Sequence, residues 1–112
     1  MTIDKLIEAV EAGDNDAVKK ISQAIASAAR DKGQLFPSHD VLKAYSFDST
    51  DAARAVCKTL LPGWAWNIDA GDGAYVENRG DFGLEYSADI PNMPARSLLL
   101  AILKAKQAEE QP

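Results

Sequence analysis

The sequence predicts an α+β fold in which helices pack on a three-stranded antiparallel β-meander. Apolar residues recur at helical spacing in residues 3–28, 53–60 and 95–105. Across residues 64–88 the apolar residues alternate with polar or small ones, which is the period of a strand. The expected order is therefore two helices, a third helix, three strands and a last helix (αα-α-βββ-α). The 112 residues are enough for one domain.

Two helices are expected within residues 1–32. Thr2 is a good N-cap for the first helix. Gly13 suits the left-handed position that follows a helix end, so the second helix should begin there, capped by Asp14 or Asn15. The apolar stripes of the two helices are Ile3, Leu6, Ile7 and Val10, followed by Val18, Ile21, Ala24, Ile25 and Ala28.

Residues 33–47 are expected to form an apolar loop. Pro37 prevents an ordinary helix from running through this segment, and Ser38 could cap only a short turn. The segment is nevertheless too apolar for a free linker, because it contains Leu35, Phe36, Val41, Leu42, Tyr45 and Phe47. The loop should therefore lie against the core and hold the N-terminal helices onto the rest of the domain.

A helix–meander–helix core is expected over residues 48–106. Its first helix begins at Asp48 or Ser49 and ends at Pro62, followed by Gly63, because proline cannot continue a helix and glycine accepts a positive φ. The buried stripe of this helix is Ala53, Val56, Cys57 and Leu60. The strand connections are too short for crossovers, so the meander should be antiparallel.

One face of the meander should be apolar and covered by helices. Trp64, Trp66 and Ile68 form this face in the first strand. The last helix begins at Pro94, a favourable first position, and the tail over residues 107–112 should fray. The last helix should bury Ala95, Leu98, Leu99, Ile102 and Ala105, with Leu103 at the margin.

Negative charge is concentrated in the meander. Residues 67–89 contain six acids and one base, whereas residues 1–47 contain seven acids and six bases. Scattered basic residues disfavour direct nucleic-acid binding, and the acidic meander favours a basic partner protein. The candidate interaction surface is Asp69, Asp72, Tyr75, Glu77, Asp81 and Glu85.

The expected location is the cytoplasm, without membrane association. Cys57 is the single cysteine, so no internal disulfide can form, and a reducing compartment is expected. The longest apolar run, residues 98–103, is far shorter than the roughly 18–20 residues of a membrane span. Residues 1–5 lack the basic and apolar regions of a secretory signal.

Catalysis and metal binding are disfavoured by the residues that could support them. Cys57 should be buried, where the pKa of a thiol rises and its reactivity falls, so a catalytic pair with His39 is not expected. Glu77 and Glu85, on adjacent strands, are more typical of a solvated sheet face than of an acid–base pair. No catalytic, cofactor-binding or metal-binding residue is predicted, and the candidates for a pocket are His39, Asp40 and Tyr45.

The acidic turn and the aromatic residues have structural interpretations. Residues 69–73 with Glu77 place glycines where a calcium loop needs oxygen ligands, so a solvated hairpin turn is preferred. The meander aromatics could stack on bases, but no basic groove accompanies them, so they are expected to pack in the core. These aromatic residues are Trp64, Trp66, Phe82 and Tyr86.

Several runs of residues carry a resemblance to a known family. They are Met1-Thr2-Ile3-Asp4-x-Leu6-Ile7, Tyr45-Ser46-x-Asp48-x-x-x-Ala52, Leu61-Pro62-Gly63-Trp64-x-Trp66, and Pro94-Ala95 opening an Ala/Leu helix that ends Ala101-Ile102-Leu103-Lys104-Ala105. The chain resembles small phage and prophage proteins of the phage ABA-sandwich domain family, in which helices flank a small antiparallel sheet. The resemblance covers about residues 1–12 and 45–106 and departs at Met93, where Thr or Ser is a common cap. It implies no functional residues.

The leading hypothesis is a non-enzymatic accessory protein of phage or prophage origin that acts through protein–protein contacts. Self-association through a sheet edge or the mixed sheet face is one form of such contact. A first alternative is a small ligand-binding domain or enzyme with a pocket at residues 33–47. A second alternative is an acidic regulator of DNA-associated proteins.

Overall fold

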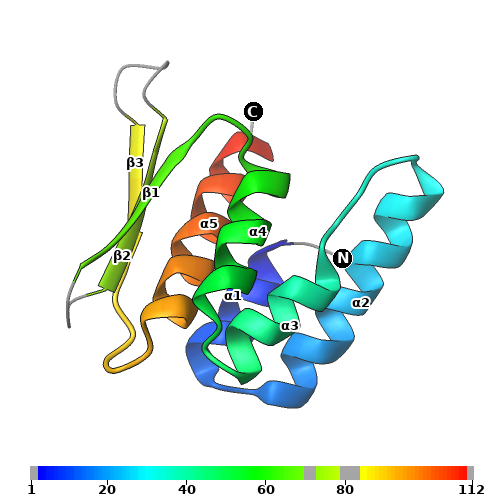
Figure 1. Ribbon diagram of the computed structural model, residues 1–112. Coiled ribbons are helices and arrows are strands. Elements are labelled where there is room, and N and C mark those ends of the chain that lie inside the picture. The colour runs from blue at the N-terminus through cyan, green and yellow to red at the C-terminus, as the bar shows by residue number, and fades with distance from the viewer. Residues whose placement is uncertain (1–2, 70–72, 79–83, 111–112) are drawn as a thin grey trace.

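The computed structural model describes residues 3–69, 73–78 and 84–110, and it confirms the α+β fold. Four helices precede an antiparallel sheet of strand order β1-β2-β3, and one helix follows it. All of these helices lie on the same side of the sheet (Figure 1). The elements are α1 (Ile3–Ala12), α2 (Asn15–Asp31), α3 (Ser38–Ser46), α4 (Thr50–Leu60), β1 (Ala65–Asp69), β2 (Gly73–Asn78), β3 (Leu84–Ala88) and α5 (Pro94–Glu110).

Local sequence signals set the starts of α2 and α4. The Asp14 carboxylate accepts a hydrogen bond from the Ala17 amide at 3.1 Å, and the Ser49 hydroxyl accepts one from the Ala52 amide at 3.2 Å. Each side chain satisfies one of the amides that a helix leaves unpaired at its first turn. Gly13, between α1 and α2, has a φ of +72°, as expected for the residue after a helix end.

Helix α3 corrects the expectation of a loop over residues 33–47. The Val41 amide donates to the Pro37 carbonyl at 3.0 Å, so Pro37 lies at the start of the helix rather than inside it. At that position its missing N–H group breaks no helical hydrogen bond. Of the apolar residues expected against the core, Phe36, Val41 and Tyr45 are buried and Leu42 is half-buried, whereas Leu35 and Phe47 are 75% and 79% exposed.

Helix α5 is the centre of the molecule and is buried on nearly all sides. It lies between the sheet and the other helices (Figure 1), in contact with α1, α3, α4 and all three strands. Ala95, every residue from Ser97 to Leu103, and Ala105 are buried. Burial is therefore much wider than the single stripe expected from the sequence, and Leu103 lies in the core rather than at its margin.

The end of α5 also corrects the expectation of a frayed tail. The helix continues to Glu110, and its Gln107 side chain donates a hydrogen bond to the Asp4 carboxylate on α1. The Lys106 ammonium lies 3.5 Å from the Glu109 carboxylate. The Gln107–Asp4 contact holds the last turns against α1, and the Lys106–Glu109 pair lies within α5 itself.

A long-range cap fixes the start of α5. Asp48, whose φ is +50°, accepts hydrogen bonds from the amides of Ala95 and Arg96 at 3.0 and 3.1 Å. The Arg96 guanidinium donates to the Tyr45 carbonyl at 2.7 and 3.2 Å and lies 4.0 Å from the centre of the Tyr45 ring. Asp48 thus caps α5 rather than α4, so the start of α5 needs no capping side chain at Met93.

Candidate interaction surface

The two faces of the sheet have different surroundings. Val76, in the central strand, pairs with Trp66 on one side and Tyr86 on the other, and this inner row faces the helices. Val76 is fully buried, but Trp66 remains 38% exposed with the Arg54 guanidinium 5.8 Å from its ring. Trp66 lies on an edge strand, so the expectation that both tryptophans are buried is wrong for this residue, and Trp64 is half-buried.

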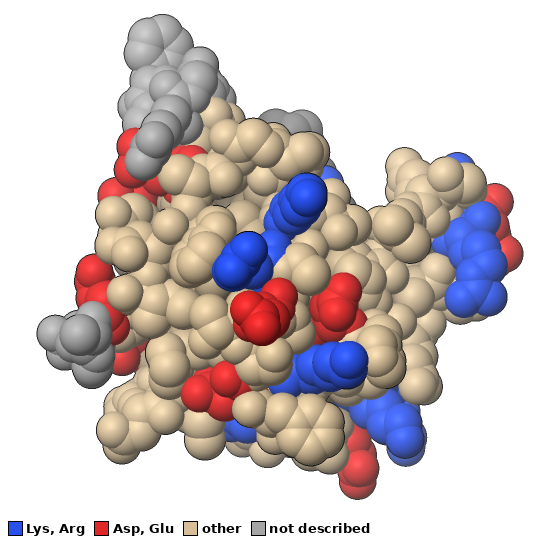
Figure 2. Space-filling view, in the orientation of Figure 1, with Lys and Arg blue, Asp and Glu red and all other residues tan. Residues whose placement is uncertain are grey.

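The outer face of the sheet has no helix over it in the described structure (Figure 1). We call this surface the acidic sheet face and define it by Asn67, Asp69, Tyr75, Glu77 and Glu85. These residues share one face because they alternate with the inner-row residues along their strands. In Figure 2 the charged side chains along the left edge, on the sheet side, are acidic, whereas acidic and basic side chains are mixed over the helices.

The acidic sheet face has no compensating base in the described strands. Glu77 and Glu85 are direct cross-strand partners, and like charges at such positions repel. The ion pairs among the described residues, Arg54–Asp51 and Lys106–Glu109, involve helices alone. The face therefore presents negative charge that the described part of the protein leaves unneutralised.

A small polar network lies at the centre of this face. The Asn67 amide donates to the Asp69 carboxylate at 3.3 Å and to the Tyr75 hydroxyl at 3.4 Å. Tyr75 is half-buried, so its ring contributes apolar surface between the carboxylates. Four of the six residues predicted for the interaction surface share this face, while Asp72 and Asp81 lie outside the described residues.

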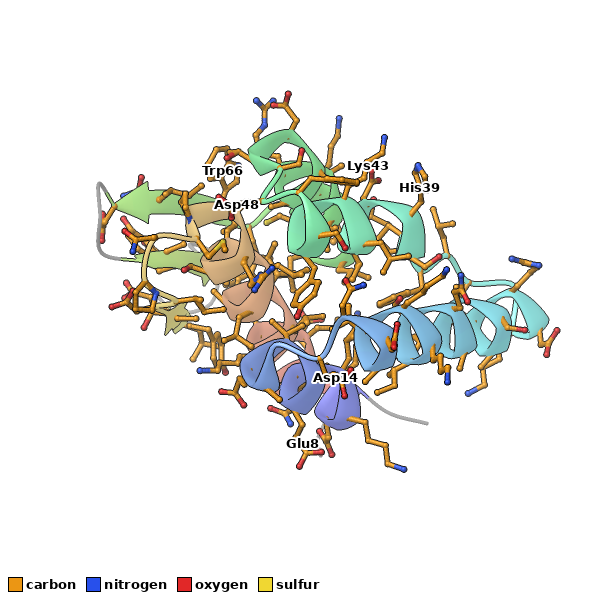
Figure 3. The ribbon with its side chains drawn as sticks, turned by 90° about the horizontal axis from the view of Figure 1, so that it is seen from below. Glu8, Asp14, His39, Lys43, Asp48 and Trp66 are labelled. Carbon is orange, nitrogen blue, oxygen red and sulfur yellow. The ribbon has the colours of Figure 1, made fainter. Side chains whose placement is uncertain are left out.

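The residues considered for a pocket do not converge. His39 is exposed and points away from the body of the protein (Figure 3), Asp40 is half-buried, and Tyr45 is 2% exposed in the core. They lie on different sides of α3, a helix in the segment where the sequence predicts a loop. Tyr45 has a structural role instead, through the contacts of its carbonyl and ring with Arg96.

Cys57 lies in the core, in line with its position on the buried stripe of α4. Burial raises the pKa of Cys57 to about 11, which keeps the thiol protonated and poorly nucleophilic at neutral pH. No cluster of three or more His, Cys, Asp or Glu side chains able to hold a metal ion occurs among the residues described. In the same part of the chain, no helix is long and apolar enough to cross a membrane.

A groove beside α2 is lined in part by residues 33–47, the segment for which the sequence raises a pocket as an alternative. It has a volume of about 580 Å³ and separates the second half of α2 from α1, α4 and α5. Its walls include Leu35 and Phe36 from that segment, but none of the pocket candidates His39, Asp40 and Tyr45. The apolar stripe of α2, which continues to Ala28 beyond the buried part of the helix, was the available signal.

No protein-family model matches the chain, and neither a curated protein nor a solved structure was found to match it.

Proposed function

We propose that the protein is a non-enzymatic accessory protein of phage or prophage origin that binds a basic partner protein through the acidic sheet face. The phage origin rests on the resemblance carried by the Leu61–Trp66 turn and the Pro94 helix start. The contact mode rests on one observation, the helix-free sheet face with Glu77 directly opposite Glu85. A cytoplasmic location accords with the single, buried thiol of Cys57.

The charge arrangement favours a basic partner. Exposed carboxylates of one sign steer an oppositely charged protein during encounter and fix its orientation. The Glu77–Glu85 repulsion costs stability in the free protein, and lysine or arginine side chains of a partner would relieve it. Tyr75 adds an aromatic contact at the centre of the face, a residue type that is enriched in interface hot spots.

The same charges argue against symmetric pairing of this face with itself. In a two-fold dimer the same surface is used by both copies, so the carboxylates of one copy would meet those of the other. A different protein is therefore the preferred partner. Self-association through the exposed edge of β3, near Leu84, remains compatible with this proposal, because an edge pairs through backbone groups.

The experiment compares two double variants of equal charge. Glu77→Gln/Glu85→Gln removes two charges from the acidic sheet face, and Glu8→Gln/Glu11→Gln removes two exposed charges from α1. Proteins retained by the immobilised wild-type chain at low salt are identified, and their affinities are measured by calorimetry. The sheet variant should bind a retained basic protein at least tenfold more weakly, while the α1 variant should match the wild type. Equal affinity for all three proteins would contradict the proposal.

An acidic regulator of DNA-associated proteins would use the same surface. In that case the partner's basic DNA-binding face would be the site that the carboxylates occupy. Adding duplex DNA to the complex should then displace the protein, with a displacement that weakens as salt is raised. If duplex DNA does not displace the protein, the partner's contact lies outside its DNA-binding face, and this form of the proposal is rejected.

A further inference from the structure

The groove beside α2 is an apolar surface that the described part of the chain leaves open. In Figure 1 the end of α2 projects from the body, and Figure 2 shows the hollow between this projection and the rest of the surface. The groove is lined by apolar side chains that include Ile25, Ala28, Leu35, Phe36 and Leu60. Leu35 is 75% exposed at its edge, so the walls are in contact with water.

The charged side chains among the described residues that line the groove are all basic. The described residues that line it include two charged side chains, Lys32 and Lys106, and no carboxylate. Lys106 lies 3.5 Å from Glu109, in a partly exposed pair. Such pairs are weak, and a lysine ammonium has three hydrogen-bond donors, so Lys106 can still bind a further anion. An occupant with an apolar side and flanking negative charge complements this lining.

We propose that this groove binds the apolar face of an acidic amphipathic helix from a partner protein. The volume of about 580 Å³ lies within the range of roughly 300–1,000 Å³ seen for binding pockets. The groove is open to solvent, and an aliphatic ligand there would leave much of its chain in water. A helix brings its own polar face to the solvent and buries only its apolar anchors.

A second copy of this chain fits the groove less well. A symmetric dimer would place Lys32 and Lys106 of both copies at one interface, and the described residues that line the groove include no acid to compensate them. The groove lies on the far side of the helices from the acidic sheet face (Figure 1). Binding here would therefore leave the acidic sheet face free, and the inference does not depend on the function proposed for that face.

The test uses designed peptides and the full chain. One peptide carries leucines at helical i, i+3, i+4 and i+7 spacing with flanking glutamates, and its matched control carries lysines in place of the glutamates. Calorimetry should show that the acidic peptide binds at least tenfold more tightly than the basic one. The preference should shrink as salt rises, because exposed charges are screened.

Two pairs of variants locate the site. Ala28→Glu places a charge in the groove, whereas Ser27→Glu adds the same charge at the neighbouring exposed position, which does not line it. The first should weaken binding of the acidic peptide about tenfold more than the second. Lys32→Gln/Lys106→Gln should weaken binding of the acidic peptide. The control Lys19→Gln/Lys20→Gln, on α2 but outside the groove, should leave that binding unchanged. Thermal unfolding confirms that each variant is folded.

Several outcomes would overturn the inference. Failure of both peptides to bind, or equal affinity for the two, would contradict it. Binding of dodecanoate that Ala28→Glu abolishes, without peptide binding, would make this a site for a small amphiphile. A dimer in light scattering that Ala28→Glu converts to monomer would show that a second copy occupies the groove.

Discussion

Helices α2 and α5 are each 17 residues long, yet their surroundings are opposite. In α5 a continuous run from Ser97 to Leu103 is buried, whereas in α2 the buried residues are Val18 and Ser22 alone. The two faces of the sheet repeat this contrast, with the inner row against α5 and the acidic sheet face in solvent. The core is thus built around one helix, and both candidate binding surfaces lie at the periphery.

The contrast has a physical cause in composition. Helix α2 is alanine-rich and capped by its own neighbour in sequence, so local propensity supports it with little packing. Helix α5 carries a run of leucine and isoleucine between Leu98 and Leu103, and it is stable because the sheet and three helices cover it. A helix such as α2 tolerates substitutions and can present a surface to a partner, whereas a buried helix such as α5 cannot.

The largest expected difference is in core substitutions. Leu99→Ala in α5 removes a fully buried side chain and should lower the free energy of unfolding by about 2–5 kcal/mol. Ile25→Ala in the half-buried part of α2 should cost about 1–2 kcal/mol, because this side chain is already partly in contact with water. Urea unfolding of both variants measures the difference. Equal losses would show that α2 is as tightly packed as α5.

The caps of α5 and α2 should differ in how much stability they contribute. Asp48→Ala should lower stability by about 2 kcal/mol, because it leaves two partly buried amides at the start of α5 without their acceptor. Asp14→Ala removes the exposed, local cap of α2 and should cost about 1 kcal/mol or less. Asp48→Asn should restore much of the loss, since asparagine accepts a positive φ. Thermal unfolding with the three variants checks this order.

The core around α4 should respond to alkaline pH. Burial raises the pKa of Cys57 to about 11 from a reference value of 9.0, so above pH 9 the unfolded chain loses a proton that the folded chain keeps. Stability should therefore be unaffected below pH 9 and should fall as pH rises from 9 to 11. Chemical unfolding across this range measures the slope. In Cys57→Ala the free energy of unfolding should fall less between pH 9 and 11 than in the wild type. Identical slopes for the two proteins would show that the thiol is not the cause of the decline.

The smallest expected effect is a gain in stability on the acidic sheet face. Glu85→Gln removes the repulsion with Glu77 and should stabilise the protein by about 0.2–1 kcal/mol. The control Glu11→Gln, at an exposed position of α1, should change stability by less than about 0.5 kcal/mol. A destabilised Glu85→Gln variant would mean that this carboxylate is compensated, and the proposed partner contact would lose its support.

The fold could be predicted from the sequence to the extent that short-range patterns determine it. Alternation across the meander predicted the strands, and the polar residues of the outer face followed from the same alternation. The groove could not be found in this way, because it is formed by residues as distant as Ile3, Ile25 and Lys106. The pocket hypothesis for residues 33–47 placed His39 and Tyr45 together, but a helix separates their side chains.

The sequence is enough to predict features that act over a few residues: a cap at Asp14 or Asn15, the left-handed Gly13, the stop at Pro62 and the concentration of acids in the meander. Three features depend on the complete fold: residues 38–46 form a helix, Asp48 caps α5 at the Ala95 amide 47 positions away, and α5 is buried on nearly all sides. The physical reason is that hydrogen bonds and apolar burial between distant segments depend on the completed packing, whereas capping and propensity depend on neighbours in the chain.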